Sequence, residues 1–81
     1  MTFELYTDAV LTLDLSEENL CAGDVVKVVG YHPVPGGEDG YSIEVFNALG
    51  NTIAVTSVPE SALEPLLPDE VFSVRRLANA A

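Results

Sequence analysis

Basic side chains are scarce in this sequence. Among its 81 residues, lysine and arginine together number three, whereas aspartate and glutamate together number thirteen, which gives a formal net charge of −10. Proteins that bind nucleic acid or anionic membranes use lysine and arginine to neutralise phosphate groups. Because Lys27 is the only such residue before Arg75 and Arg76, we expect neither nucleic acid nor membrane among the partners.

Cysteine and histidine are equally scarce, with one of each, Cys21 and His32. A single cysteine cannot form an internal disulfide. The opening residues, MTFELYTD, contain neither the basic region nor the long apolar run of a signal peptide or anchor. We therefore expect the protein in the reducing cytoplasm.

Motifs for catalysis and metal binding are missing as well. The sequence has no C-x-x-C or H-E-x-x-H spacing, and its acidic clusters lack the D-x-[DN]-x-[DN]-G spacing of a calcium loop. Catalysis needs a base, an orienting group and an oxyanion donor together. The sequence therefore predicts no enzyme, no metal and no cofactor, with Cys21 a structural residue and His32 solvent-facing.

Glycine and proline are concentrated in one stretch, GYHPVPGGEDGY, at residues 30–41. A phosphate-binding loop would contain a lysine and lead into a helix. This stretch lacks lysine, places Glu38 and Asp39 where phosphate charge would lie, and leads into a strand pattern. We interpret it as a connector whose glycines and prolines serve the turn.

Apolar residues make up 48% of the chain, enough for one small folded domain. Short apolar runs separated by turn residues recur at a spacing typical of an all-β barrel or sandwich. We predict a β domain over residues 1–67 and a tail over residues 68–81. The expected strands are residues 8–13, 24–31, 41–46, 52–58 and 63–67.

Alternation along these strands predicts the core residues. The second strand is apolar on both faces, which a bulge or two-sided burial would explain. The third and fourth strands form a hairpin, with Gly50 free to take a positive φ at the turn. The predicted core contains Leu11, Leu13, Val28, Ile43, Val45, Ile53 and Val55.

The acidic loop of residues 14–24 allows one helical turn, which Gly23 would end, and Leu20 is expected to return to the core. A short 3₁₀ or helical turn is expected after Pro59. The tail has acids near its start and arginines later, which suits a short helix and its dipole. Its apolar residues either pack on the open end of the barrel or leave the tail frayed.

Five pieces of the sequence, in order, resemble the bacterial family called domain of unknown function 4926. They are V-L-T-x-D-L, N-L-C-A-G-D-V-V-x-V-V, Y-S-I-E-V-F, G-N-T-I-A-V and L-E-P-L. The resemblance covers about Tyr6 to Leu66. It implies an all-β fold, a small five-stranded antiparallel SH3-like barrel, and carries no known catalytic residues.

The resemblance also implies small acidic proteins, some of them encoded beside toxin-like genes. We therefore expect a protein-binding module, an antitoxin or immunity-type inhibitor of a basic partner, since an acidic inhibitor can mask a basic cleft. Two alternatives remain: the protein is an assembly subunit of a larger complex, or its charge only maintains solubility. The residues expected to contact the partner are Glu17, Glu18, Leu20, Glu38, Asp39 and Phe72.

Overall fold

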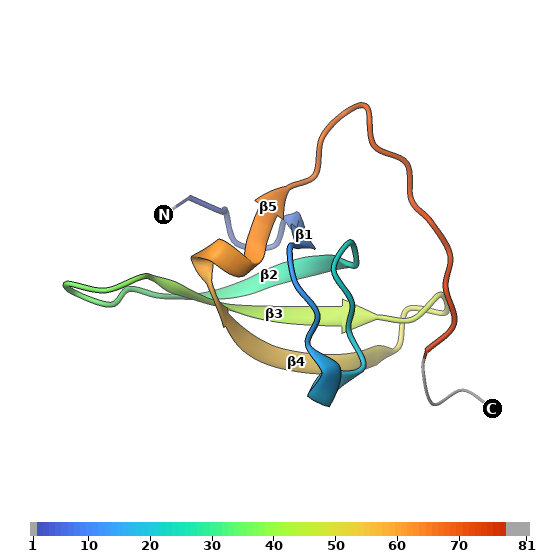
Figure 1. Cartoon of the computed structure of the whole chain (residues 1–81), viewed down its shortest axis with the longest axis horizontal. Helices are drawn as coiled ribbons and strands as arrows, with labels where there is room; N and C mark the ends of the chain where they lie inside the picture. Colours follow the sequence, from blue (N-terminus) through green and yellow to red (C-terminus); the bar gives the residue numbers. More distant parts are fainter. Residues whose placement is uncertain (1, 78–81) are drawn as a thin grey trace.

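The computed structural model describes residues 2–77, and in these residues five strands form one antiparallel sheet in the order β4-β3-β2-β1-β5 (Figure 1). Two 3₁₀ turns, η1 and η2, interrupt the strands. The elements are β1 (Asp8–Leu11), η1 (Ser16–Glu18), β2 (Val25–His32), β3 (Gly40–Phe46), β4 (Thr52–Pro59), η2 (Glu60–Ala62) and β5 (Leu63–Pro65). The predicted all-β, SH3-like fold of five antiparallel strands is confirmed, but within residues 2–77 β4 and β5 do not pair to close the barrel.

A β-bulge lies in the middle of β2. Val28 pairs with Ile43 and Gly30 pairs with Ser42, so Val29 is the extra residue on its strand. A bulge changes which residues face the core, because it interrupts the alternation of side chains. Val28 is therefore buried before the bulge, whereas Tyr31 packs against the core after it. This explains why both faces of the strand are apolar, as the bulge hypothesis required.

A second bulge, in β4, overturns part of the predicted core. Val45 pairs with Ala54 and Phe46 pairs with Thr52, so Ile53 is the extra residue. Ile53 packs against the core as predicted, but the alternation then shifts and Ala54 is buried next to it. Val55 is consequently 61% exposed. The prediction that Val55 is a core residue was wrong, because it requires side chains to alternate along β4 without a bulge.

The first strand is shorter than predicted. It ends at Leu11, after which the backbone N–H of Thr12 donates to the carbonyl of Ala62 and the chain leaves the sheet. Leu13 is therefore 40% exposed, and its predicted place in the core was wrong. The remaining predicted core residues, Leu11, Val28, Ile43 and Val45, are buried.

Tyr41 lies at the centre of the core and is completely buried. Its ring packs edge-on against Phe3 at a centroid distance of 5.4 Å and in a tilted arrangement against Tyr31 at 5.3 Å. Its hydroxyl accepts hydrogen bonds from the backbone N–H groups of Thr2 (2.9 Å) and Phe3 (3.2 Å). The N-terminal segment is thereby attached to the sheet.

The tail contains no helix within its described residues, 68–77, so the predicted helix was wrong there; residues 78–81 lie outside the described part. Figure 1 shows the tail leaving β5, arching away and returning along the other end of the sheet. A short isolated helix is marginal in water, and Val71, Phe72 and Val74 are too exposed to stabilise one by packing. Over residues 2–77, no helix has the length and apolar character needed to span a membrane.

Candidate functional site

The residues predicted to bind a partner lie in three separate places. Glu17 and Glu18 belong to η1, Glu38 and Asp39 to the loop between β2 and β3, and Phe72 to the tail. Figure 1 shows η1 below the sheet and the β2–β3 loop projecting from its left-hand end. The two acidic loops therefore do not form one continuous surface.

Leu20 does not belong to any exposed patch, because its side chain is only 1% exposed. Its backbone exchanges two hydrogen bonds with Leu15, at 2.9 and 3.1 Å, which close the loop that carries η1. The expectation that Leu20 returns to the core is confirmed. Its assignment to an exposed apolar patch was wrong, since the side chain is packed among the core residues.

Asp39 organises the β2–β3 loop. One carboxylate oxygen accepts the backbone N–H of Val34 at 3.0 Å, and the other accepts the Tyr31 hydroxyl at 2.7 Å. Both hydrogen bonds favour the ionised carboxylate and lower the pKa of Asp39. The bond to Asp39, together with burial, raises the pKa of Tyr31 to about 12. Asp39 is therefore a structural residue of this loop.

The same loop is fastened to η2. Glu38 accepts the backbone N–H of Ser61 at 2.8 Å, and the backbone carbonyl of Asp39 accepts the N–H of Glu60 at 2.9 Å. The Glu60 carboxylate in turn accepts the Tyr41 hydroxyl at 3.3 Å. The stretch connects β2 to β3, as predicted, and its acids also join that hairpin to the turn before β5.

The acids of η1 are used differently. Glu17 and Glu18 are exposed, and within residues 2–77 neither carboxylate has a hydrogen-bond or ion-pair partner. The charge of η1 is therefore fully presented to solvent, next to the body of the sheet.

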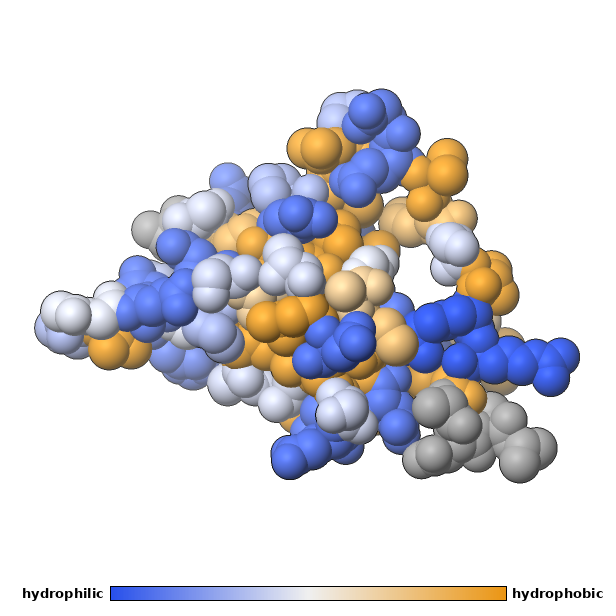
Figure 2. Space-filling view, in the orientation of Figure 1, coloured by the Kyte–Doolittle hydropathy of each residue, from blue (hydrophilic) through white to orange (hydrophobic). Residues whose placement is uncertain are grey.

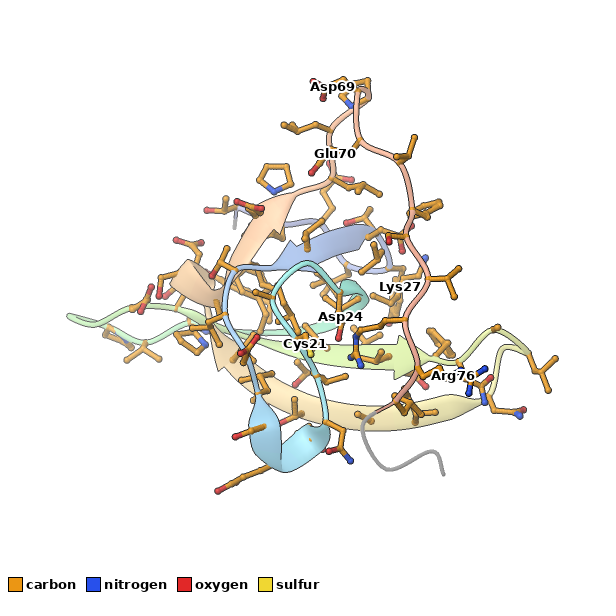
Figure 3. The ribbon with its side chains drawn as sticks, turned by 45° about the vertical axis from the view of Figure 1, so that its right-hand side comes forward. Cys21, Asp24, Lys27, Asp69, Glu70 and Arg76 are labelled. Carbon is orange, nitrogen blue, oxygen red and sulfur yellow. The ribbon has the colours of Figure 1, made fainter. Side chains whose placement is uncertain are left out.

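A further site, which the sequence patterns did not indicate, lies where the tail crosses the end of the sheet (Figure 3). We call it the end groove. It is the surface that tail residues 73, 74, 75 and 77 cover, and a pocket of about 270 Å³ remains between these residues and the rest of the molecule. On the sheet side the residues that line it include Leu20, Asp24, Val25, Val45, Phe46 and Ile53.

Arg75 anchors the tail in the end groove. Its Nε donates to Asp24 Oδ1 at 2.9 Å, while Nη2 donates to Asp24 Oδ2 and to the backbone carbonyl of Asn19. Burial alone would raise the pKa of Asp24, but the bonds from Arg75 and from the Cys21 N–H outweigh it and lower that pKa. Hydrogen bonding to Asp24 likewise raises the pKa of Arg75. Both groups are charged at neutral pH.

A polar row crosses the outer face of the sheet. His32 Nε2 lies 2.6 Å from Ser42 Oγ, which lies 3.3 Å from Ser57 Oγ. His32 is exposed, as predicted. Within residues 2–77 no carboxylate is hydrogen-bonded to the imidazole ring, whose side-chain partner is the Ser42 hydroxyl. The same residues contain no cluster of three or more potential metal ligands.

The sequence from residue 5 to residue 65 matches one family model. The chain belongs to the family described as Domain of unknown function (DUF4926). The DUF4926 segment contains all five strands and both acidic loops, whereas the tail that covers the end groove lies beyond it. The predicted family is thus confirmed. No curated protein and no solved structure matches the chain.

Proposed function

We propose that this DUF4926 protein is a non-catalytic binding module of the bacterial cytoplasm that holds a basic partner protein, in the manner of an antitoxin or immunity inhibitor. The observation that carries the proposal is unpaired negative charge. Lys27 pairs with Asp8 at 2.9 Å and Arg75 pairs with Asp24. Within residues 2–77, the other eleven of the thirteen acids (13 − 2) have no ion-pair partner.

The exposed acids of η1 are the part of this surface best suited to direct contact. The carboxylates of Glu17 and Glu18 are free, so binding a cation there breaks no internal bond. Glu38 and Asp39 contribute to the long-range field, but their oxygens already accept hydrogen bonds from the protein. Complementary charge of this kind raises the rate of association more than it raises affinity.

The proposal is tested by capturing partners from the native host and measuring how they associate. The tagged protein is used at low salt, and a retained basic protein is purified and followed by stopped-flow fluorescence. Exposed charges are screened beyond about 10 Å at 0.1 M salt. We therefore expect association to slow markedly as salt rises, with a smaller change in dissociation. An association rate indifferent to salt contradicts the proposal.

The assembly-subunit alternative is favoured by one observation, the edge strand β4. Residues 52–58 contain no charged side chain, and β4 is the last strand on its side of the sheet. Uncharged edges with unpaired backbone groups readily accept a strand from another chain. Under this alternative, Val55→Lys releases the protein from a complex that Val55→Thr still enters, which sedimentation velocity measures.

A further inference from the structure

We infer that the end groove receives an extended, arginine-containing segment of the basic partner, and that residues 73–77 of the chain itself occupy the groove until that segment displaces them. The inference rests on the proposed function, and it adds where and how the partner is recognised. The chain's own tail serves as the template for the chemistry of the occupant.

The receptor side of the groove is fixed without the tail. Asp24 Oδ2 accepts the backbone N–H of Cys21 at 2.7 Å, and the N–H of Asp24 donates to the Cys21 carbonyl at 3.0 Å. The N–H of Gly23 donates to the Leu11 carbonyl at 2.8 Å, which ties this turn to β1. With Arg75 in place, the Asp24 side chain is only 17% exposed. A carboxylate held in this way is preorganised, so a ligand spends little free energy in ordering it.

The polar contacts fit a guanidinium group. Nε and Nη2 of Arg75 bond to the two oxygens of Asp24, and Nη2 also reaches the Asn19 carbonyl at 3.0 Å. This forked, bidentate arrangement uses the planar geometry of arginine, which a lysine ammonium lacks. The groove therefore selects arginine over lysine.

The apolar contacts indicate an extended segment. Leu77, two residues after Arg75, lines the groove and is 36% exposed, whereas Val74, the residue before Arg75, is 98% exposed. Alternation of this kind is typical of extended chain, in which every second side chain faces the same way. An arginine followed two positions later by an aliphatic residue thus matches both Asp24 and the apolar wall formed by Val25, Phe46 and Ile53.

The tail is held loosely enough to be displaced. Before the groove it arches over the sheet, with Val71 92% and Phe72 74% exposed, and Figure 2 shows an opening between this arch and the body. The Arg75 side chain is 34% exposed, and ion pairs at the surface contribute little to stability. Residues 1–67 carry eleven acids and one lysine, so their field attracts basic segments that compete with the tail.

The test uses full-length protein and a fluorescein-labelled peptide of residues 70–77 as the probe. Fluorescence anisotropy measures its affinity for wild-type protein and for the variants Arg75→Lys and Arg76→Lys, which have the same net charge. The bond between Arg75 and Asp24 favours the state in which the tail covers the groove, and an exposed ion pair does so by no more than about fivefold. We therefore expect the Arg75→Lys protein to bind the probe up to about fivefold more tightly than the other two proteins. Equal affinity for all three proteins overturns the inference.

Two probe peptides give a second, independent comparison. Peptides carrying Arg75→Lys or Arg76→Lys have identical composition and charge, so only the position of the guanidinium differs. We expect the Arg75→Lys peptide to bind the Arg75→Lys protein more weakly than the Arg76→Lys peptide does. Equal binding of both peptides shows that the groove recognises charge alone and overturns the inference.

A groove variant completes the design. Asp24→Asn keeps an acceptor for the Cys21 N–H but loses the charge, and it should abolish the difference between the peptides. A difference that persists in Asp24→Asn overturns the inference. If the amide spectrum of Asp24→Asn shows unfolding, Phe46→Ala replaces it; this variant removes part of the apolar wall and should weaken the binding of both peptides, and unchanged binding overturns the inference. So does a concentration-dependent dimer with exchanged tails, which would make a second copy of the chain the occupant.

The partner experiment separates this inference from the proposed function. A basic partner that binds wild-type and Asp24→Asn protein equally, with salt-dependent association, leaves the proposed function standing and overturns the groove. If no basic protein is captured, the proposed function fails, while the peptide titrations still support or overturn the preference for an arginine-containing segment.

Discussion

The two acidic loops of the chain look alike in sequence but use their carboxylates in opposite ways. Glu38 and Asp39 accept hydrogen bonds that shape the β2–β3 loop and attach it to η2. Within residues 2–77, Glu17 and Glu18 have no such partner and are exposed. The comparison teaches that a pair of adjacent acids indicates a binding surface only where their oxygens are free.

Local geometry explains the difference. Asp39 lies at the base of a hairpin, opposite Tyr31 and the Val34 backbone, so donors surround its carboxylate. Glu17 and Glu18 lie in a 3₁₀ turn whose two ends are joined by the bridge between Leu15 and Leu20. Side chains on that turn project into water, where no donor from residues 2–77 bonds to them.

The largest expected loss of stability comes from a substitution in the core, and the effects of substitutions in the two loops can be compared with it. Ile43→Ala should lower the free energy of unfolding by about 2–4 kcal/mol, because Ile43 is fully buried and its loss leaves a cavity. Val55→Ala, on the same hairpin but 61% exposed, should change it by less than about 0.5 kcal/mol. Urea melts measure both. Equal losses would contradict the bulge at Ile53.

The next effect compares the loops directly. Asp39→Ala should lower Tm by about 4–8 °C, the shift expected when a domain of this size loses a net hydrogen bond, because the Tyr31 hydroxyl and Val34 N–H both lose their acceptor. Glu17→Ala removes the same charge and no internal bond, so its Tm should stay near that of the wild type. Calorimetry at pH 7 measures both. Similar shifts would show that the loops are equivalent after all.

The hydrogen bond between Tyr31 and Asp39 also predicts a dependence on pH. The pKa of Tyr31 is raised from 10.0 to about 12, so its contribution to stability is complete below pH 10 and is lost as pH rises through about 12. The pKa of Asp39 is lowered, so its contribution is present above the unfolded-state pKa and is lost as pH falls through the folded-state value.

Ultraviolet titration at 295 nm checks the alkaline limb. One of the tyrosines should ionise near pH 12 in the wild type and shift toward 10 in Asp39→Ala, with no such shift in Glu17→Ala. An unchanged titration curve in Asp39→Ala would contradict the assignment of Asp39 as the acceptor that raises the pKa.

Local patterns in the sequence were enough to predict the strands and the β3–β4 hairpin. The turn at Gly50, with φ of 83°, and the return of Leu20 to the core were also predictable, because neighbouring residues decide them. The inward face of β4 was not predictable in this way. The bulge at Ile53 depends on the pairing with β3, and the residues of β4 by themselves do not indicate it.

The roles of the acids depend on contacts even more distant in the chain. Glu38 meets the Ser61 backbone 23 positions later, and Arg75 reaches Asp24 across 51 positions. Alternation and turn chemistry describe neighbours within a few residues, so neither contact leaves a periodic signal. The end groove could therefore not be predicted from the sequence, although Arg75 and Arg76 are two of the three basic residues in the chain.

The smallest effect on stability belongs to the acids of η1. Replacing both Glu17 and Glu18 with lysine should leave the urea midpoint unchanged, because neither side chain is bonded within residues 2–77. The matched control, Glu4→Lys with Glu64→Lys, changes the net charge equally at two other exposed acids. If η1 contacts the basic partner, the η1 pair should slow association more than the control pair does at the same salt concentration, since steering depends on where charge lies as well as on its sum. Equal slowing by both pairs would mean that only net charge matters, and η1 would then be no more than one part of a diffuse acidic surface.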